Sequence, residues 1–334
     1  MKLPTLCMVF CRGRVGGSRR VLLFMIPPFF RYLRPLRNAF PTVAAWLIPC
    51  SIALAQDSAK PPLKDALKDA LAFHAGFDTG PDANFARGDQ ALYHAPAMDK
   101  RQNAVPGLPP GGEVSIAAQS GRFGGALRFT QSKGPMVFFK GGKNLPPLSP
   151  GWSGTVCFWL NTDPVKDLPE GFCDPFQVTA KQWDDASIFV EFEKRPSGIP
   201  FRLGVYADKN VWNPTGRKFE EIPPAERPVA AVENPPFSAG KWTHVGITFK
   251  GFNTGKPEGT ALLFLDGQQA AAISPRTQSF TWEAGREAIM LGLSYIGLMD
   301  DLAIFDRALD LEEIQQVFSL KTGVAELRKA PGAK

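Results

Sequence analysis

Short hydrophobic runs follow one another from Leu71 to Phe305, and turn-forming residues separate them. The runs are rich in Phe, Val, Ile and Trp, while Gly, Pro, Asn and Asp gather between them. This punctuation is typical of the short strands of a β-sandwich or barrel, and not of alternating strands and helices. The clearest predicted strands are residues 136–140, 154–161, 187–193, 201–206, 242–249 and 261–266.

The pattern within the runs predicts which faces are buried. In residues 187–193, a hydrophobic face (Ile188, Val190, Phe192) alternates with a face that carries Glu191 and Glu193. Residues 156–160 are instead hydrophobic at every position, which predicts a central strand covered on both sides. The strands therefore fit a two-sheet antiparallel sandwich.

One helix is clearly signalled near the C-terminus. Asp310 can cap the first amides, and Glu313 follows at the spacing of a capping box. Its hydrophobic stripe is Leu311, Ile314, Val317 and Phe318. The charged repeat within residues 56–70 is either a short helix or a linker. We expect the domain to span residues 71–320 and residues 321–334 to form a disordered tail.

The first 55 residues have the character of a secretion leader. They carry eight basic residues and no Asp or Glu, and an apolar run from Pro41 ends in Ala53-Leu54-Ala55. Small residues in this spacing are typical of a signal-peptidase site, so we expect cleavage after Ala55. A start at Met25 would give a leader of ordinary length. The run is too short and too interrupted by proline to span a bilayer comfortably, so we expect no membrane span in the mature chain.

Removing this leader changes the charge of the chain. The whole sequence has a net charge of +6, with 38 basic and 32 acidic residues. Subtracting the eight basic residues of the leader leaves 30 against 32, a net charge of about −2 for residues 56–334. The high isoelectric point therefore belongs to the leader and gives no support for a nucleic-acid partner.

Two cysteines remain after the leader is removed, Cys157 and Cys173. In an exported protein an even pair is consistent with a disulfide. Two buried thiols fit the sequence equally well, because spacing alone does not show that the side chains approach each other.

Six segments occur in an order that is known from one family. The first is Leu71-Ala-Phe-His-Ala-Gly-Phe-Asp78, and the second is Gly121-Arg-Phe-Gly-Gly-Ala-Leu-Arg-Phe129. The others are residues 155–160, 240–245, 265–267 and 299–309. Together they resemble laminin G-like jelly-roll domains of the concanavalin A-like lectin/glucanase superfamily. The resemblance covers residues 71 to about 318 and implies a jelly-roll sandwich with a short C-terminal helix.

The resemblance also implies a structural Ca²⁺ ion that ties the first strand to the last. Asp78 ends the first predicted strand and Asp300 lies in the closing strand, so both are candidate metal ligands. Ca²⁺ prefers such hard oxygen ligands. The alternative is that these aspartates only stabilise turns.

A second candidate site combines aromatic and polar side chains in loops. Sugar-binding faces pair aromatic rings with hydrogen-bonding groups, because sugar rings present both C–H faces and hydroxyls. The candidate ligand-binding residues are Trp183, Tyr206, Asp208, Trp212 and Asn213. The alternative is that the rings only pack over a sheet.

The sequence gives little support for catalysis. No Gly-x-Ser-x-Gly motif surrounds a serine, and we interpret His244 as a strand residue that bonds across the sheet. Glu191 and Glu193 share one strand face, but Phe189 stands where catalytic relatives have another acid, so we interpret them as a solvated face.

We therefore expect a secreted, periplasmic or cell-surface recognition module without catalytic residues. A glycan is the favoured partner, an extracellular protein is the alternative, and a glycoside hydrolase or lyase is the third possibility.

Overall fold

The computed structural model describes residues 62–329, which belong to one compact unit of two antiparallel sheets packed as a sandwich. This confirms the predicted fold class. The expected cleavage site after Ala55 lies outside the described residues. Within residues 62–329, no helix has the length and apolar character needed to cross a membrane.

Sheet A has nine strands in the spatial order β15-β14-β13-β8-β17-β1-β2, with the hairpin β5–β6 attached to β17. Its strands are β1 Leu71–Ala75, β2 Phe85–Ala86, β5 Val114–Ala117, β6 Ala126–Phe129, β8 Trp152–Asn161, β13 Thr243–Phe252, β14 Gly259–Leu265, β15 Gln268–Arg276 and β17 Gly297–Phe305.

Sheet B has eight strands in the order β12-β11-β10-β9-β16-β7-β3-β4. Its strands are β3 Leu92–Ala95, β4 Val105–Pro106, β7 Met136–Lys140, β9 Gly171–Thr179, β10 Ser187–Lys194, β11 Phe201–Tyr206, β12 Val229–Val232 and β16 Ala288–Leu293.

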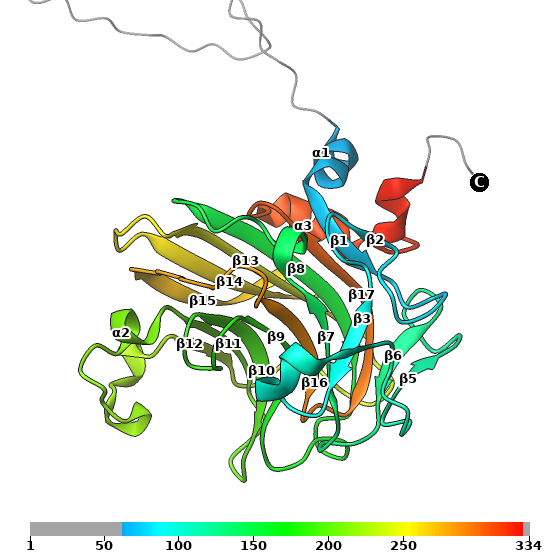
Figure 1. The fold of residues 1–334 in the computed structure, drawn as a ribbon, viewed down its shortest axis with the longest axis horizontal. Helices are drawn as coiled ribbons and strands as arrows, with labels where there is room; N and C mark the ends of the chain where they lie inside the picture. The colour runs from blue at the N-terminus through cyan, green and yellow to red at the C-terminus, as the bar shows by residue number, and fades with distance from the viewer. Residues whose placement is uncertain (1–61, 330–334) are drawn as a thin grey trace, which may run out of the picture. The chain divides into compact units, whose positions relative to one another are not determined.

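Helical elements are short and few among the described residues. They are α1 Leu63–Ala70, α2 Lys209–Trp212, α3 Leu311–Phe318 and the 3₁₀ turns η1 Met98–Asn103, η2 Gly142–Asn144, η3 Phe219–Glu221, η4 Pro224–Glu226 and η5 Val324–Arg328. In Figure 1, α1, α3 and the C-terminal turn η5 lie together beside sheet A, whereas α2 lies at the far end of sheet B, near β11 and β12.

The main core lies between the two sheets. One face of every long strand contributes to it, and the alternation predicted for β10 is confirmed, because Ile188, Val190 and Phe192 belong to this core. A second core lies between the outer face of sheet A and the helices α1, α3 and η5. Strand β8 is covered on both sides, since Phe158 lies in the main core and Cys157 in the second.

Local signals in the sequence explain several elements. Asp266 and Gly267 both have positive φ angles, 48° and 75°, as the two-residue turn between β14 and β15 requires. Asp310 caps α3, since its Oδ1 accepts a hydrogen bond from the Glu313 amide at 2.9 Å, while Glu313 Oε2 accepts one from the Asp310 amide at 3.0 Å. This capping box is the one that the sequence predicts.

The C-terminal segment differs from the prediction of a disordered tail from residue 321. The turn η5 packs against sheet A, and Val324 is fully buried. The Asp301 carboxylate accepts hydrogen bonds from the Val324 amide at 3.1 and 3.0 Å and contacts His74 Nε2 at 2.8 Å. The segment is ordered because its buried side chains and its amide both have partners on the sheet.

Candidate functional site

The two outer faces of the sandwich differ in what covers them. The helices α1, α3 and η5 cover sheet A, whereas η1 covers only part of the outer face of sheet B. There, Arg101 of η1 donates hydrogen bonds to the carbonyl oxygens of Thr179 and Ala180, at 3.4 and 3.0 Å. Helices therefore cover only part of the outer face of sheet B. The side chains along its centre, such as Gln177, Phe189 and Met290, are buried, and the exposed rings of Phe172 and Trp183 lie toward its ends.

The strand register shows which side chains share this face. Gln177, Phe189 and Gly204 lie opposite one another on β9, β10 and β11. The ring of Phe189 lies across Gly204, where a Cβ would come within 2.2 Å of it. On the other side of Gln177 the row continues through Met290 and Phe138 to Tyr93. The centre of the face is thus a cross-strand row of mainly hydrophobic side chains.

All five predicted ligand-binding residues gather at one end of this face, beyond β10 and β11. Tyr206 is buried, and its ring contacts those of Trp183, Phe189 and Trp212, with centroid distances of 5.6, 5.6 and 4.9 Å. Trp183 is 50% exposed. Burial raises the pKa of Tyr206, and its hydroxyl makes no hydrogen bond within the described residues. An exposed indole thus lies beside a buried phenol.

The polar members of this group have structural partners. Asp208 Oδ1 accepts hydrogen bonds from Lys181 Nζ at 2.6 Å and from the amide and hydroxyl of Thr281 at 3.2 and 3.0 Å. Asn213 closes a loop by binding the backbone of Arg217 at both ends of its amide. Trp212 Nε1 donates to the Asp184 carbonyl at 2.8 Å. These three residues hold the loops that present Trp183.

An acid cluster, which we define as Asp174, Glu191, Glu193 and Arg202, lies at the other end of the same face. Arg202 Nε donates to Glu191 Oε1 at 3.0 Å, and its Nη1 donates to Glu193 Oε2 at 2.8 Å. Glu191 is only 5% exposed. The prediction that Glu191 and Glu193 form a solvated strand face is therefore wrong, because Arg202 on the next strand pairs with both.

Asp174 joins this cluster through an irregularity in β9. The register between β9 and β10 shifts between Val190 and Phe192, opposite Asp174 and Pro175. Burial raises the pKa of Asp174 well above its ordinary value, and the neighbouring Glu191 carboxylate adds to this while Arg202 opposes it. Burial also raises the pKa of Glu191, against the effect of Arg202. Asp174 and Glu191 thus lie close enough to act on each other electrostatically, with Arg202 as the cation that faces both.

The sequence analysis does not identify Asp174, Arg202, Phe172 or Gln177 as site residues. A proline inside a strand is a signal for a bulge, and Pro175 gives that signal here. Phe172 is 56% exposed, and Arg202 lies over its ring at 5.0 Å. Only the pairing of β10 with β9 on one side and with β11 on the other brings these residues together.

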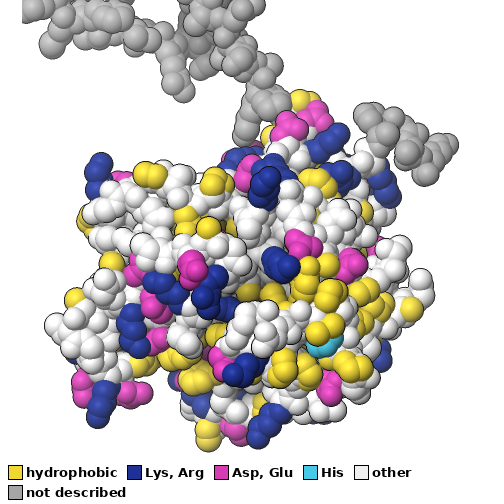
Figure 2. Space-filling view, in the orientation of Figure 1, with side chains coloured by type: hydrophobic (Ala, Val, Ile, Leu, Met, Phe, Trp, Pro, Cys, Tyr) yellow, Lys and Arg dark blue, Asp and Glu magenta, His cyan; other side chains and the backbone are white. Residues whose placement is uncertain are grey.

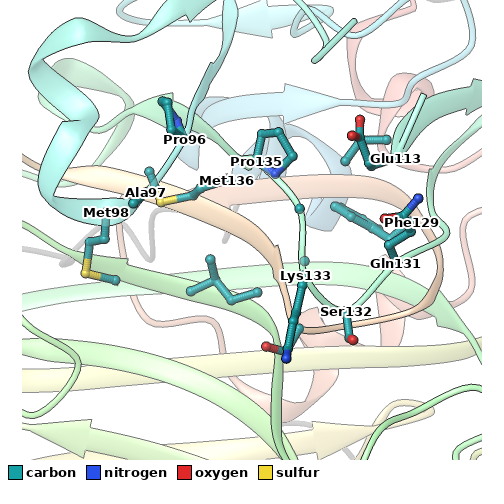
Figure 3. Close-up of a pocket in the computed structure, with 15 residues that line it drawn as sticks. Pro96, Ala97, Met98, Glu113, Phe129, Gln131, Ser132, Lys133, Pro135 and Met136 are labelled. Carbon is teal, nitrogen blue, oxygen red and sulfur yellow. The ribbon is translucent and has the colours of Figure 1, made fainter. Parts of the chain in front are cut away.

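The edge of this face nearest β3 and β7 is hydrophobic. Figure 2 shows hydrophobic side chains gathered over these strands, which include Tyr93, Met98 and Leu293 around Phe138 and Met136. A pocket of about 200 Å³ opens beside them. In Figure 3, Met98 and Met136 lie on one side of it and Glu113, Gln131 and Lys133 on the other.

The candidate metal ligands Asp78 and Asp300 lie near each other at the 121–125 loop. Asp78 Oδ1 accepts a hydrogen bond from the Gly125 amide at 2.8 Å, and Asp300 Oδ2 accepts one from the Phe123 amide at 2.9 Å. Asp300 Oδ1 is buried and has no partner. Burial, with the nearby Asp301 and Asp78 carboxylates, raises the pKa of Asp300 to about 7.

A cation would compensate this buried acid. Residues 62–329 contain no group of three or more His, Cys, Asp or Glu side chains that could hold a metal, so backbone carbonyl oxygens or water would have to complete the shell. The unpartnered Oδ1 and the two convergent aspartates fit a Ca²⁺ ion on these terms.

The cysteines and His244 occupy buried positions. Cys157 and Cys173 are free thiols in the structure. Cys173 lies in the main core between the sheets, and Cys157 lies in the second core on the outer face of sheet A, so the structure has two buried thiols and no disulfide between them. His244 lies between the rings of Trp159 and Phe318, and neither of its nitrogens has a hydrogen-bond partner. His244 is a strand residue of β13 that pairs across the sheet with Trp159 of β8, as predicted, while hydrophobic rings surround its imidazole.

A comparison with known protein families identifies the family of this chain. A family model described as the concanavalin A-like lectin/glucanases superfamily matches residues 143–315. No curated protein matches the chain.

Among solved structures, domain 4 of AbnA, a GH43 extracellular arabinanase from Geobacillus stearothermophilus in complex with arabinotriose, is 16% identical with a TM-score of 0.45, over 74% of this chain and 97% of that domain. The binding domain of Paraclostridial Mosquitocidal Protein 1 is 14% identical with a TM-score of 0.45, over 75% of this chain and 52% of the other. Trypanosoma rangeli sialidase is 15% identical with a TM-score of 0.40, over 64% of this chain and 29% of the enzyme. At these identities the similarity concerns the fold alone.

Proposed function

Because the chain belongs to the concanavalin A-like lectin/glucanases superfamily, we propose that it is an exported, non-catalytic carbohydrate-binding module that holds a glycan against the outer face of sheet B. One observation carries this proposal. Two half-exposed aromatic rings flank β9: Phe172 lies near the start of the strand, and Trp183 lies in the turn after its end, against the ring of Tyr206.

The spacing of these rings suits an extended ligand. Seven residue steps separate Phe172 from Thr179 at the end of β9, roughly 23 Å at the usual rise of a strand, and Trp183 lies in the turn that follows. Along this span the Asp174 carboxylate and the Tyr206 hydroxyl make no hydrogen bond within the described residues. An oligosaccharide of several units would place ring faces on the aromatic side chains and hydroxyls on the polar groups.

A protein partner remains the second candidate function, and a different observation favours it. The hydrophobic edge formed by Tyr93, Met98 and Leu293 continues to Val105, which is 53% exposed. Contiguous exposed hydrophobic surface marks interaction sites. A glycan would thus use strands β9 to β11, and a protein would use the edge of the same sheet at β3 and β4.

We also propose that Asp78 and Asp300 hold a structural Ca²⁺ ion. Its role would be to neutralise the buried carboxylate of Asp300 and to fasten the 121–125 loop between the first and last strands. The buried Asp300 Oδ1 supports this proposal.

The proposal of glycan binding is tested with Trp183→Ala and Phe172→Ala. Affinity electrophoresis and pull-down on a panel of insoluble polysaccharides would be measured for residues 56–334. Loss of a stacking ring should weaken binding by roughly tenfold. Leu311→Ala is the matched control, because Leu311 is 48% exposed on α3, beside the other sheet.

Three outcomes would contradict the proposal. Wild-type protein that binds no polysaccharide would favour a protein partner, and aromatic variants that bind as well as wild type would place the site elsewhere. Release of reducing sugar by the wild type, lost in Glu191→Gln, would show an enzyme instead.

Export is tested separately by N-terminal sequencing of secreted material. The sequence should begin at Gln56, and recovery of the intact chain from the cytoplasm would refute processing after Ala55.

A further inference from the structure

The acid cluster contains three carboxylates and one guanidinium, and Arg195 outside the cluster lies 3.5 Å from Glu193. Arg202 is the guanidinium that faces both Asp174 and Glu191, and its nitrogens are already bound to Glu191 and Glu193. Neither Asp174 oxygen accepts a hydrogen bond within the described residues. Native proteins rarely leave a part-buried carboxylate in this state, so Asp174 is available to a partner from outside the chain.

Only one of the two oxygens of the Glu191 carboxylate accepts hydrogen bonds. Both bonds from Arg202 go to Oε1, while Oε2 has no hydrogen-bond partner in the described part of the chain. Asp174 and Glu191 act on each other electrostatically, which requires them to be close. Together they offer a hydrogen-bond donor three free carboxylate oxygens.

An unpartnered amide borders the same pair. Gln177 is 1% exposed, and its Nε2 has no hydrogen-bond partner. The register places it opposite Phe189, next to the position of Glu191 on the strand and just beyond the bulge that carries Asp174. A buried donor without a partner beside unpaired acceptors is an independent sign of a missing polar ligand.

An aromatic ring completes the surroundings. One face of Phe172 lies against Arg202, and the side chain is otherwise half exposed. A ring in this position can also attract a ligand cation. The Phe172 ring at the rim and the carboxylates at the centre of the cluster therefore both favour a positively charged ligand.

We infer that the glycan of this face is an amino sugar with a free amine, and that Asp174 is the residue that selects it. The inference rests on the proposed glycan-binding function. The ammonium group donates to Asp174 and to Glu191 Oε2, and an adjacent hydroxyl oxygen accepts from Gln177 Nε2 after a small movement of that side chain. Charge-assisted bonds of this kind exceed neutral ones in strength.

Other sugar classes fit the cluster less well. The carboxylate of a uronic acid would meet two like charges, and all three nitrogens of Arg202 already bind Glu191 or Glu193. A neutral sugar can supply hydroxyl donors, but it leaves the unpaired negative charge in place.

The test compares four oligosaccharides of equal length by titration calorimetry: glucosamine, N-acetylglucosamine, glucose and galacturonic acid oligomers. The glucosamine oligomer should bind about tenfold tighter than the glucose oligomer, as one charge-assisted bond to a part-buried acid provides. Asp174→Asn should remove this preference, so that the variant binds the glucosamine and glucose oligomers with equal affinity. Glu312→Gln, an exposed acid on α3, is the matched control.

The asparagine variant should fold at least as well as wild type, because it removes a like-charge contact with Glu191, and a thermal melt checks this. Equal affinities for glucose and glucosamine oligomers would overturn the inference and leave glycan binding intact. A preference for the galacturonic acid oligomer, or a preference for glucosamine that survives in Asp174→Asn, would also overturn it. Binding to polylysine without binding to any oligosaccharide would refute both this inference and the proposed function.

Discussion

Asp78 and Asp300 hold the same loop from two distant parts of the chain. Asp78 follows the first strand and binds the Gly125 amide, while Asp300 lies in the last strand and binds the Phe123 amide. The loop fits closely between them, since a Cβ on Gly124 would come within 2.3 Å of Asp78 Oδ1. The first and last strands of sheet A therefore share one fastening point.

If Ca²⁺ binds here, removing it should destabilise the protein. A ligand that binds only the folded state stabilises it, by about 2.7 kcal/mol at a hundredfold excess over Kd. The melting temperature should fall in excess chelator and recover when Ca²⁺ is added back. Asp300→Asn should be insensitive to both treatments, and an unchanged wild-type melting curve would remove the ion from this site.

His244→Leu should make the protein more resistant to acid. Burial lowers the pKa of His244 from 6.5 to about 4, with Asp301 and Asp266 opposing, so the unfolded chain binds a proton that the folded chain does not. Stability from this group is present above pH 6.5 and lost as the pH falls through about 4, by roughly 3 kcal/mol. Urea unfolding at about pH 7 and about pH 4 measures the difference.

Asp300 should show the opposite dependence of stability on pH, so it serves as the control for the His244 prediction. Its pKa is raised to about 7, so its stabilising effect is present below pH 3.8 and lost as the pH rises through 7. Asp300→Asn without metal should therefore gain stability over wild type at about pH 8. Parallel stability curves for the wild type and His244→Leu would show that the imidazole is not buried as described.

Arg202→Met should destabilise the fold strongly. It leaves Glu191, whose side chain is 7% exposed, without its cation. Breaking a buried ion pair from one side costs about 3 kcal/mol or more. Arg195→Met is the matched control, because Arg195 pairs with Glu193 and Glu233 but is 41% exposed, and its loss should cost less than about 1 kcal/mol. Similar losses in denaturant unfolding would contradict the burial of the Arg202–Glu191 pair.

Thiol titration of residues 56–334 should find two free cysteines. Both should be unreactive in the folded protein, because Cys157 and Cys173 are buried and burial raises the pKa of Cys173 to about 12. Both should react in denaturant without any reductant. If they form a disulfide instead, no thiol would react until a reductant is added.

Much of the fold follows from short-range patterns. The residues predicted for β7 and β11 are those observed, and the capping box of α3 forms as expected. These elements depend on alternation, turn residues and capping groups, which are all local features of the sequence.

The candidate site depends on pairings between strands, which local patterns do not reveal. Asp174 meets Glu191 and Arg202 only because β9, β10 and β11 are neighbours with a bulge at Pro175. For the same reason, Glu191 has the sequence pattern of a surface acid although it is buried. Part of the aromatic group around Tyr206 was easier to predict, because Tyr206 and Trp212 are close in sequence, whereas the hairpin of β10 and β11 brings Trp183 to them.

The contact between α1 and η5 places both ends of the described chain on the same side of the module. Lys64 of α1 binds Glu326 of η5, so the described chain enters and leaves beside sheet A. Any attachment through either end would hold that side toward its anchor and leave the outer face of sheet B directed away from it. A reporter fused at either end should therefore leave ligand access unhindered.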